Sequence, residues 1–179
     1  MRVILKKFST QDLLYMAIFA ALGLAIKPLV TPLIHLFSAP LLIPGGSLAG
    51  GFYMMWLALV VAIVNKTGTG TLFGVIQAIV VIALGYFGNH GAVSLLSYTL
   101  PGIVADGIAI FLRPKNSLFA QVLICTLANL CGVLVVTILV MRLAFIPLLI
   151  ALVAAAISGI AGGVVSRLLF VKLKQYRII

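Results

Sequence analysis

Apolar runs long enough to cross a lipid bilayer follow one another along almost the whole chain, and short segments rich in lysine and arginine separate them. A helix needs about 20 apolar residues to span a hydrocarbon core roughly 30 Å thick. The 179 residues are 64% hydrophobic and 8% charged, and their mean hydropathy of +1.36 is far above that of soluble domains. We therefore expect roughly six spans in a single integral membrane domain, residues 1–179.

The positive charges predict how these helices are oriented. In a soluble protein a net charge of +10 would suggest nucleic acid as a partner, but here the basic residues stand at the ends of apolar runs, so we expect no nucleic acid. Only Lys27 and Arg142 fall on the side opposite the others. The positive-inside rule then predicts an even number of spans with both termini in the cytoplasm. The residues expected on the cytoplasmic side are Arg2, Lys6, Lys7, Lys66, Arg113, Lys115, Arg167, Lys172, Lys174 and Arg177.

The fold class predicted is all-α, a bundle of six transmembrane helices with a long capping loop between the first and second helices. The loop is residues 28–46, which are too apolar for a free aqueous loop and too rich in proline for a straight span. We expect this loop to pack on the protein as a lid. Pro101 and Gly102 should kink the fourth helix. The expected helices are about 10–27, 47–65, 71–87, 94–112, 117–140 and 148–171.

Small residues recur every four positions in the first helix, at Ala17, Ala21 and Ala25. Such a strip lets another helix approach closely, either within the bundle or from a partner subunit. Similar strips occur in the sixth helix and at the start of the second. Spacing alone favours ordinary internal packing for all of them. The further strips are Ala155, Gly159 and Gly163, and Gly46 with Gly50.

Polar side chains within the predicted spans are a sharper signal, because a charge in hydrocarbon costs roughly 2.5 to 3.5 kcal/mol even on the mildest scale. Asp106 is the one acidic residue inside a predicted span, and it can serve either as a structural partner for donors or as a ligand or coupling group. Gln77 and Asn129 are mid-helix amides. They can bond across helices, which is the favoured interpretation, or bind a ligand.

Aromatic and hydrogen-bonding side chains gather toward the predicted outer face. Any single aromatic there is typical of the membrane interface, but together they predict a site for a flat, partly polar molecule. We expect this site beneath the 28–46 loop, between the second, third, fourth and sixth helices. The group consists of Lys27, His35, Tyr53, Trp56, Tyr86, Asn89, His90, Tyr98 and Arg142.

Signatures of an enzyme are missing from the sequence. It has no phosphate-binding loop, no paired carboxylates and no His-Glu-x-x-His motif. Cys125 and Cys131 match no metal-binding spacing, and we interpret both as small apolar packing residues. We therefore expect neither catalysis nor a cofactor nor a bound metal.

The number of helices, the strip Ala17-xxx-Ala21-xxx-Ala25 and the long apolar first loop together resemble the substrate-binding S components of energy-coupling-factor (ECF) transporters. The resemblance covers nearly the whole chain. The runs from Gly51 to Trp56, Gly88-Asn89 and Gly102 to Asp106 are most similar to the YkoE-type thiamine and hydroxymethylpyrimidine group.

The resemblance implies capture of a vitamin or vitamin precursor at the cell membrane of a prokaryote. A transmembrane coupling subunit and two cytoplasmic ATPases would supply the work, and Ala17, Ala21 and Ala25 would face the coupling subunit. Thiamine, its pyrimidine, and a cobalamin precursor such as a benzimidazole or its riboside all remain open as substrates. The substrate-binding residues expected are Tyr53, Trp56, Gln77, Tyr86, Asn89, His90, Tyr98, Asp106 and Asn129.

A second class of function stays open, a small homo-oligomeric transporter or channel that works without partner subunits. Its glycine strips would form the contacts between copies. A proton-coupled carrier needs a titratable residue in the membrane, and Asp106 is the acidic candidate.

Overall fold

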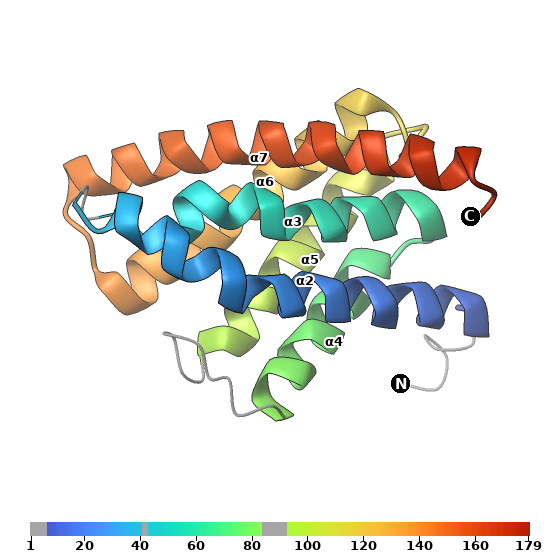
Figure 1. The fold of residues 1–179 in the computed structure, drawn as a ribbon, viewed down its shortest axis with the longest axis horizontal. Coiled ribbons are helices and arrows are strands. Elements are labelled where there is room, and N and C mark those ends of the chain that lie inside the picture. Colours follow the sequence, from blue (N-terminus) through green and yellow to red (C-terminus); the bar gives the residue numbers. More distant parts are fainter. Residues whose placement is uncertain (1–6, 41–42, 84–92) are drawn as a thin grey trace.

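The structure is a computed structural model that describes residues 7–40, 43–83 and 93–179. The described chain is helical and contains no strand, which confirms the all-α fold class (Figure 1). The helices are α2 (Thr10–Ser38), α3 (Gly45–Val64), α4 (Thr69–Ala83), α5 (Ser94–Phe111), α6 (Leu118–Val136) and α7 (Phe145–Gln175), with a short π-helical segment η2 (Thr137–Met141) that continues α6.

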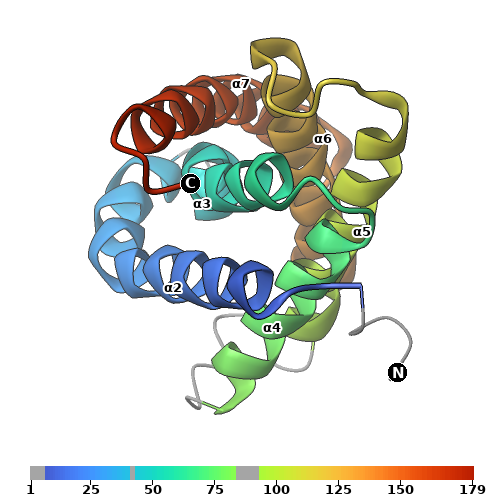
Figure 2. The ribbon, with the colours of Figure 1, turned by 90° about the vertical axis from the view of Figure 1, so that its right-hand side faces the viewer.

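Helix α3 lies in the middle of the bundle, with the other helices around it (Figure 2). It packs against α2, α4, α6 and α7, and more weakly against α5. Its central residues Leu59, Val60 and Val61 are completely buried. A helix that is apolar on all sides is stable only in such a place or in lipid, so α3 forms the core.

Most of the surrounding helices turn large aliphatic side chains outward. Leu29 in α2, Ile103 in α5 and Ile157 in α7 are at least half exposed. Five of the described helices are long and apolar enough to cross a membrane, while α4 is apolar but has 15 described residues. Large apolar surfaces of this kind suit contact with lipid. The chain is a multi-pass helical membrane protein.

Both ends of the described chain lie at the same end of the bundle (Figure 1). The Tyr15 hydroxyl near the start of α2 donates a hydrogen bond of 3.0 Å to the carbonyl of Ile178. The turns α3–α4 and α5–α6, which carry Lys66 and Lys115, also lie at this basic end, because Lys66 pairs with Asp12 and Lys115 bonds the Asn65 carbonyl. This arrangement matches an even number of crossings.

The predicted lid over residues 28–46 is wrong for most of its length. Helix α2 runs on through Pro28 and Pro32 to Ser38, and it bends between its dark blue and light blue parts (Figure 1). A proline inside a helix costs about 3 kcal/mol, whereas each backbone group left unsatisfied in a membrane costs several. The unsatisfied backbone groups of a nineteen-residue open loop would therefore cost more free energy than two prolines within a helix, and the helix continues.

The other boundaries differ less from those expected. Helix α5 continues through Pro101, and α7 is longer than predicted at both ends. Helix α6 passes into η2 and stops at Arg142, which adopts a left-handed conformation with φ of 48°. The connection expected between the helices at 71–87 and 94–112 lies outside the described residues.

Glycines and small residues let α7 press against its neighbours. A Cβ at Gly162 would overlap the backbone of Gly51 in α3, and one at Gly163 would overlap the backbone of Val122 in α6. The Gly51 amide also donates a 3.0 Å hydrogen bond to the Ser158 hydroxyl. The small-residue strip of the sixth helix is therefore an internal packing surface.

Candidate ligand-binding site

Lys27 is a basic residue inside a membrane-spanning helix rather than at its end. It lies 17 residues after the start of α2, about 25 Å along the helix axis at 1.5 Å per residue. Its partly buried ammonium donates a hydrogen bond of 2.7 Å to the Tyr98 hydroxyl of α5. The nitrogen also lies 4.2 Å from the centre of the Tyr98 ring and 4.9 Å from that of Tyr53 in α3. Two π faces and one hydroxyl oxygen hold this cation.

More polar groups from neighbouring helices adjoin Lys27. The Tyr53 hydroxyl shares a hydrogen bond of 3.1 Å with the hydroxyl of Thr31, one turn beyond Lys27 in α2. One turn in the other direction, a Cβ at Gly23 would lie 3.1 Å from the Trp56 ring and 3.3 Å from the Gln77 amide nitrogen. We call Lys27, Thr31, Tyr53, Trp56, Gln77 and Tyr98 the outer polar cluster, after the outer face at which the sequence predicted such a group. It lies among α2, α3, α4 and α5.

Two members of the outer polar cluster have hydrogen-bonding capacity left over. The indole nitrogen of Trp56 is buried and has no partner in the described part of the chain. The Gln77 amide lies on α4, next to that indole, and makes no hydrogen bond to any described residue. A buried donor without a partner costs about 1 to 3 kcal/mol, so these groups suit an incoming acceptor.

Helix α2 presents two opposite faces. Phe19, Gly23, Lys27 and Thr31 recur every four residues on the inner face, where Phe19 stacks on Trp56 with ring centres 5.9 Å apart. Positions two residues apart differ by about 200° around a helix. The strip of Ala17, Ala21 and Ala25 therefore points away from the outer polar cluster, and all three alanines are exposed.

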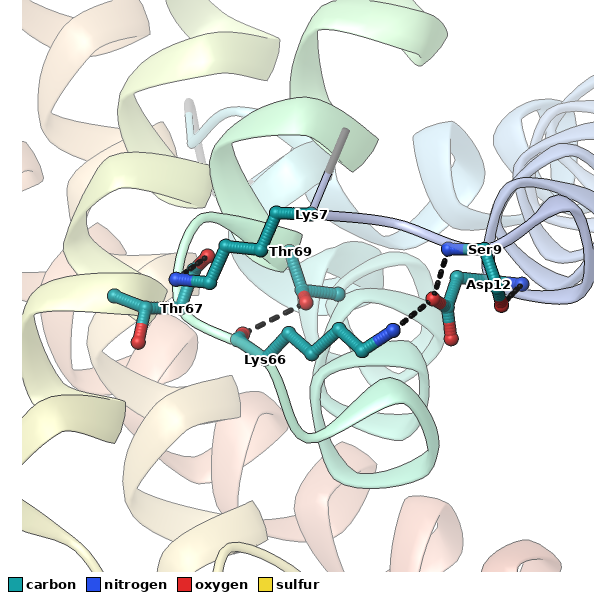
Figure 3. Close-up of polar contacts among 6 residues, drawn as sticks. All are labelled: Lys7, Ser9, Asp12, Lys66, Thr67 and Thr69. Carbon is teal, nitrogen blue, oxygen red and sulfur yellow. Dashed lines mark hydrogen bonds and ion pairs between the residues drawn. The ribbon is translucent and has the colours of Figure 1, made fainter. Parts of the chain in front are cut away.

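The chain contains two acidic residues, and both are engaged elsewhere. Asp12 belongs to a capping box with Ser9 at the start of α2 and pairs with Lys66 (Figure 3). The same view shows Lys7 donating to the Thr67 carbonyl and the Thr69 hydroxyl donating to the Lys66 carbonyl. These contacts tie the start of α2 to the α3–α4 turn, at the basic end of the bundle.

Asp106, the second acid, is a helix cap. Its carboxylate accepts hydrogen bonds of 2.9 Å from the Gly70 amide, 2.7 Å from the Thr71 amide and 2.6 Å from the Thr71 hydroxyl. The free amides at a helix start favour a negative charge. Asp106 is 7% exposed and lies about 12 Å along α5 from Tyr98, so it does not join the outer polar cluster.

The other expected site residues divide into three groups. Asn129 is buried and donates a 2.8 Å hydrogen bond to the Ala155 carbonyl, which links α6 to α7 away from the outer polar cluster. His35 and Arg142 are exposed and have no contact with Lys27. Tyr86, Asn89 and His90 lie outside the described residues.

The candidate site is surrounded by a different set of helices from the one expected. The first helix provides a wall where the sixth was expected, because its inner face continues past Pro28. Thr31 and the close approach at Gly23 were missed in the sequence. The repeat of Phe19, Gly23, Lys27 and Thr31 at a spacing of four is the signal that would have found them, once the helix is extended through the prolines.

Several apolar helices surround a polar cluster with unused donors at membrane depth, an arrangement typical of a membrane transport protein. Residues 11–131, about two thirds of the chain, match the family described as "ABC-type cobalt transport system, permease component". The chain belongs to this family and is a membrane component of an ECF-type transporter, a class that works with ATPase subunits. Comparison with curated proteins and with solved structures gives no match.

Proposed function

We propose that this chain is the substrate-binding S component of an ECF-type importer. The proposal rests on the two opposite faces of α2, which carry different kinds of side chain. Its inner face contributes Lys27 to a polar cluster able to hold a ligand, and its outer face exposes a smooth strip of alanines. A strip without long side chains is the surface over which another helix can pack closely in lipid.

The proposed partners are a transmembrane coupling subunit, which packs on Ala17, Ala21 and Ala25, and two cytoplasmic ATPases. The chain itself has no phosphate-binding loop, so the energy for transport comes from those subunits. We place the basic end of the bundle, with both termini, in the cytoplasm of a prokaryotic cell. The outer polar cluster then lies in the outer half of the membrane.

The proposed cargo is an organic vitamin or vitamin precursor. The outer polar cluster supplies ammonium, phenol, indole and amide groups, and these suit a heteroaromatic molecule better than a bare divalent cation, which prefers imidazole, thiolate or carboxylate. The described residues form no group of three or more His, Cys, Asp or Glu side chains that could hold a metal ion. Thiamine, its pyrimidine and a benzimidazole or its riboside are the compounds to test first.

Reconstitution into liposomes tests the proposal. The purified chain alone should bind its ligand but not move it across the membrane. Uptake should begin when the coupling subunit, the two ATPases and ATP are added. Transport by the chain alone, down a gradient or with protons, would instead establish the self-sufficient carrier or channel as the function.

A further inference from the structure

We infer that the molecule captured at the outer polar cluster carries a negatively charged group, a carboxylate or a phosphate, that binds the ammonium of Lys27. The inference rests on the proposed capture function and narrows its substrate class to anions, so thiamine, its pyrimidine and the benzimidazole riboside fit only in phosphorylated form. It draws on three features of the described structure: the place of Lys27, the lack of an acid near it and the donors around it.

Lys27 is held by groups that stabilise a cation without neutralising it. The Tyr98 hydroxyl accepts one hydrogen bond from the ammonium, and the rings of Tyr53 and Tyr98 lie within 5 Å of the nitrogen. A cation–π contact contributes about 0.5 to 2 kcal/mol. A charge at membrane depth costs roughly 2.5 to 3.5 kcal/mol, which is more than one such contact contributes. The cation therefore remains short of a full counter-charge.

The chain cannot supply that counter-charge from its own side chains. Its two acidic residues are Asp12 and Asp106. Asp12 lies 15 residues before Lys27 on the same helix, about 22 Å away along the axis, and pairs with Lys66. Both carboxylate oxygens of Asp106 accept hydrogen bonds from Gly70 and Thr71 at the start of α4. The end of the described chain is also remote from Lys27, because Ile178 lies at the basic end, beside Tyr15.

Three further groups of the outer polar cluster can donate hydrogen bonds. The buried Trp56 indole nitrogen can only donate, and the Gln77 amide nitrogen lies next to it. The Tyr98 oxygen already accepts from Lys27, and its own proton makes no hydrogen bond to any other described residue. A ligand that brings acceptor oxygens offers these donors partners that the described residues do not supply. A cation such as thiamine without a phosphate would face Lys27 with like charge.

The inference is tested with the pool of small molecules extracted from growth medium and sorted by ion exchange into anionic, neutral and cationic fractions. Each fraction is added to the purified chain in an uncharged maltoside detergent, which provides no anionic headgroup. Binding is followed by thermal stabilisation and by the emission of Trp56, the single tryptophan. The compound bound is then identified by mass spectrometry.

The comparison uses Lys27→Met, which removes the charge while keeping an unbranched side chain, and Arg142→Gln, which removes an exposed charge outside the outer polar cluster. We expect the anionic fraction to act on the wild type and on Arg142→Gln. Lys27→Met should need about thirtyfold more of it or not respond, as is usual when one partner of a desolvated charge pair is lost.

Three results would overturn the inference, and they differ in what they leave standing. A response confined to the neutral or cationic fraction would show that capture is real but its ligand is not an anion. No response to any fraction would contradict the capture function itself. Stabilisation that depends on Lys27 and appears only on adding phosphatidylglycerol would assign the counter-charge to lipid.

Discussion

Lys27 is in a position that stability alone does not favour. Its ammonium is partly buried in the bundle, and no carboxylate lies near it in the described structure. Replacing an unpaired charge in such a place with an apolar side chain of similar length removes a desolvation cost. We therefore expect Lys27→Met to raise the free energy of unfolding by roughly 1 to 3 kcal/mol.

Thermal or denaturant unfolding of the ligand-free protein in detergent measures this effect. Arg142→Met is the control, because Arg142 is exposed at the end of η2 and its charge can remain in water. If Lys27→Met unfolds more easily than the wild type, then Lys27 is a structural residue and its contacts with Tyr53 and Tyr98 outweigh the cost of burial.

The sequence identified some of these residues but not their partners. Asp106 stood out as an acid within a span, yet its partners, Gly70 and Thr71, precede it by about 35 positions at the start of another helix. Sequence spacing does not show that two helices cross there. Asn129 was identified in the same way, and the structure supplies its partner, the Ala155 carbonyl. The sequence shows which polar side chains are unfavourable in the membrane, but only the packing of the helices shows which groups form hydrogen bonds with them.

At the scale of elements, helix number and most boundaries could be predicted because hydrophobic length is dictated by the bilayer. The end of α2 could not, because Pro28 and Pro32 are local breaking signals that the membrane environment overrides. This error mattered for the site. With α2 ended at residue 27, the inner face of the helix was cut short and Thr31 was excluded from it.

Helix α7 provides a test of the packing. A methyl group at Gly162 would overlap the Gly51 backbone of α3, whereas a Cβ at Gly107 in α5 would meet open space. We expect Gly162→Ala to destabilise the fold by about 1 to 3 kcal/mol, as overpacking does. Gly107→Ala should be neutral or stabilising by up to about 1 kcal/mol, because alanine is the better helix former.

Unfolding of the two variants under the same conditions gives the comparison. Equal stability of Gly162→Ala and Gly107→Ala would show that α3 and α7 do not approach as closely as the structure describes. The pair is informative because both changes add one methyl group to a helix, and they differ only in what that methyl group meets.

At the scale of the whole molecule, the basic end gathers both termini, and the proposed orientation places it in the cytoplasm. A cysteine at Gln175 should then resist impermeant maleimide in intact cells and react after the membrane is opened. A cysteine at Arg142, at the other end of α6, should react from outside. Cys125 and Cys131 would first be replaced by alanine to remove background. Labelling of residue 175 in intact cells would reverse the orientation.

In the proposed function, α2 links ligand capture to transport because it contributes to both surfaces. The outer polar cluster lies on one face of this helix and the exposed alanine strip on the other. A change at Ala21 should therefore alter docking without touching the outer polar cluster. A self-sufficient carrier needs no docking face apart from its binding site, so this separation favours the S component.

The most direct test is ATP-driven uptake by the complete complex carrying Ala21→Trp, measured together with ligand affinity of the same purified variant. The control is Ile157→Trp, which places an indole on an exposed face of α7. Because an indole prevents close helix contact, we expect uptake by Ala21→Trp to fall about tenfold or more while affinity stays within about twofold of wild type. Ile157→Trp should change neither. Wild-type uptake by Ala21→Trp would contradict the account.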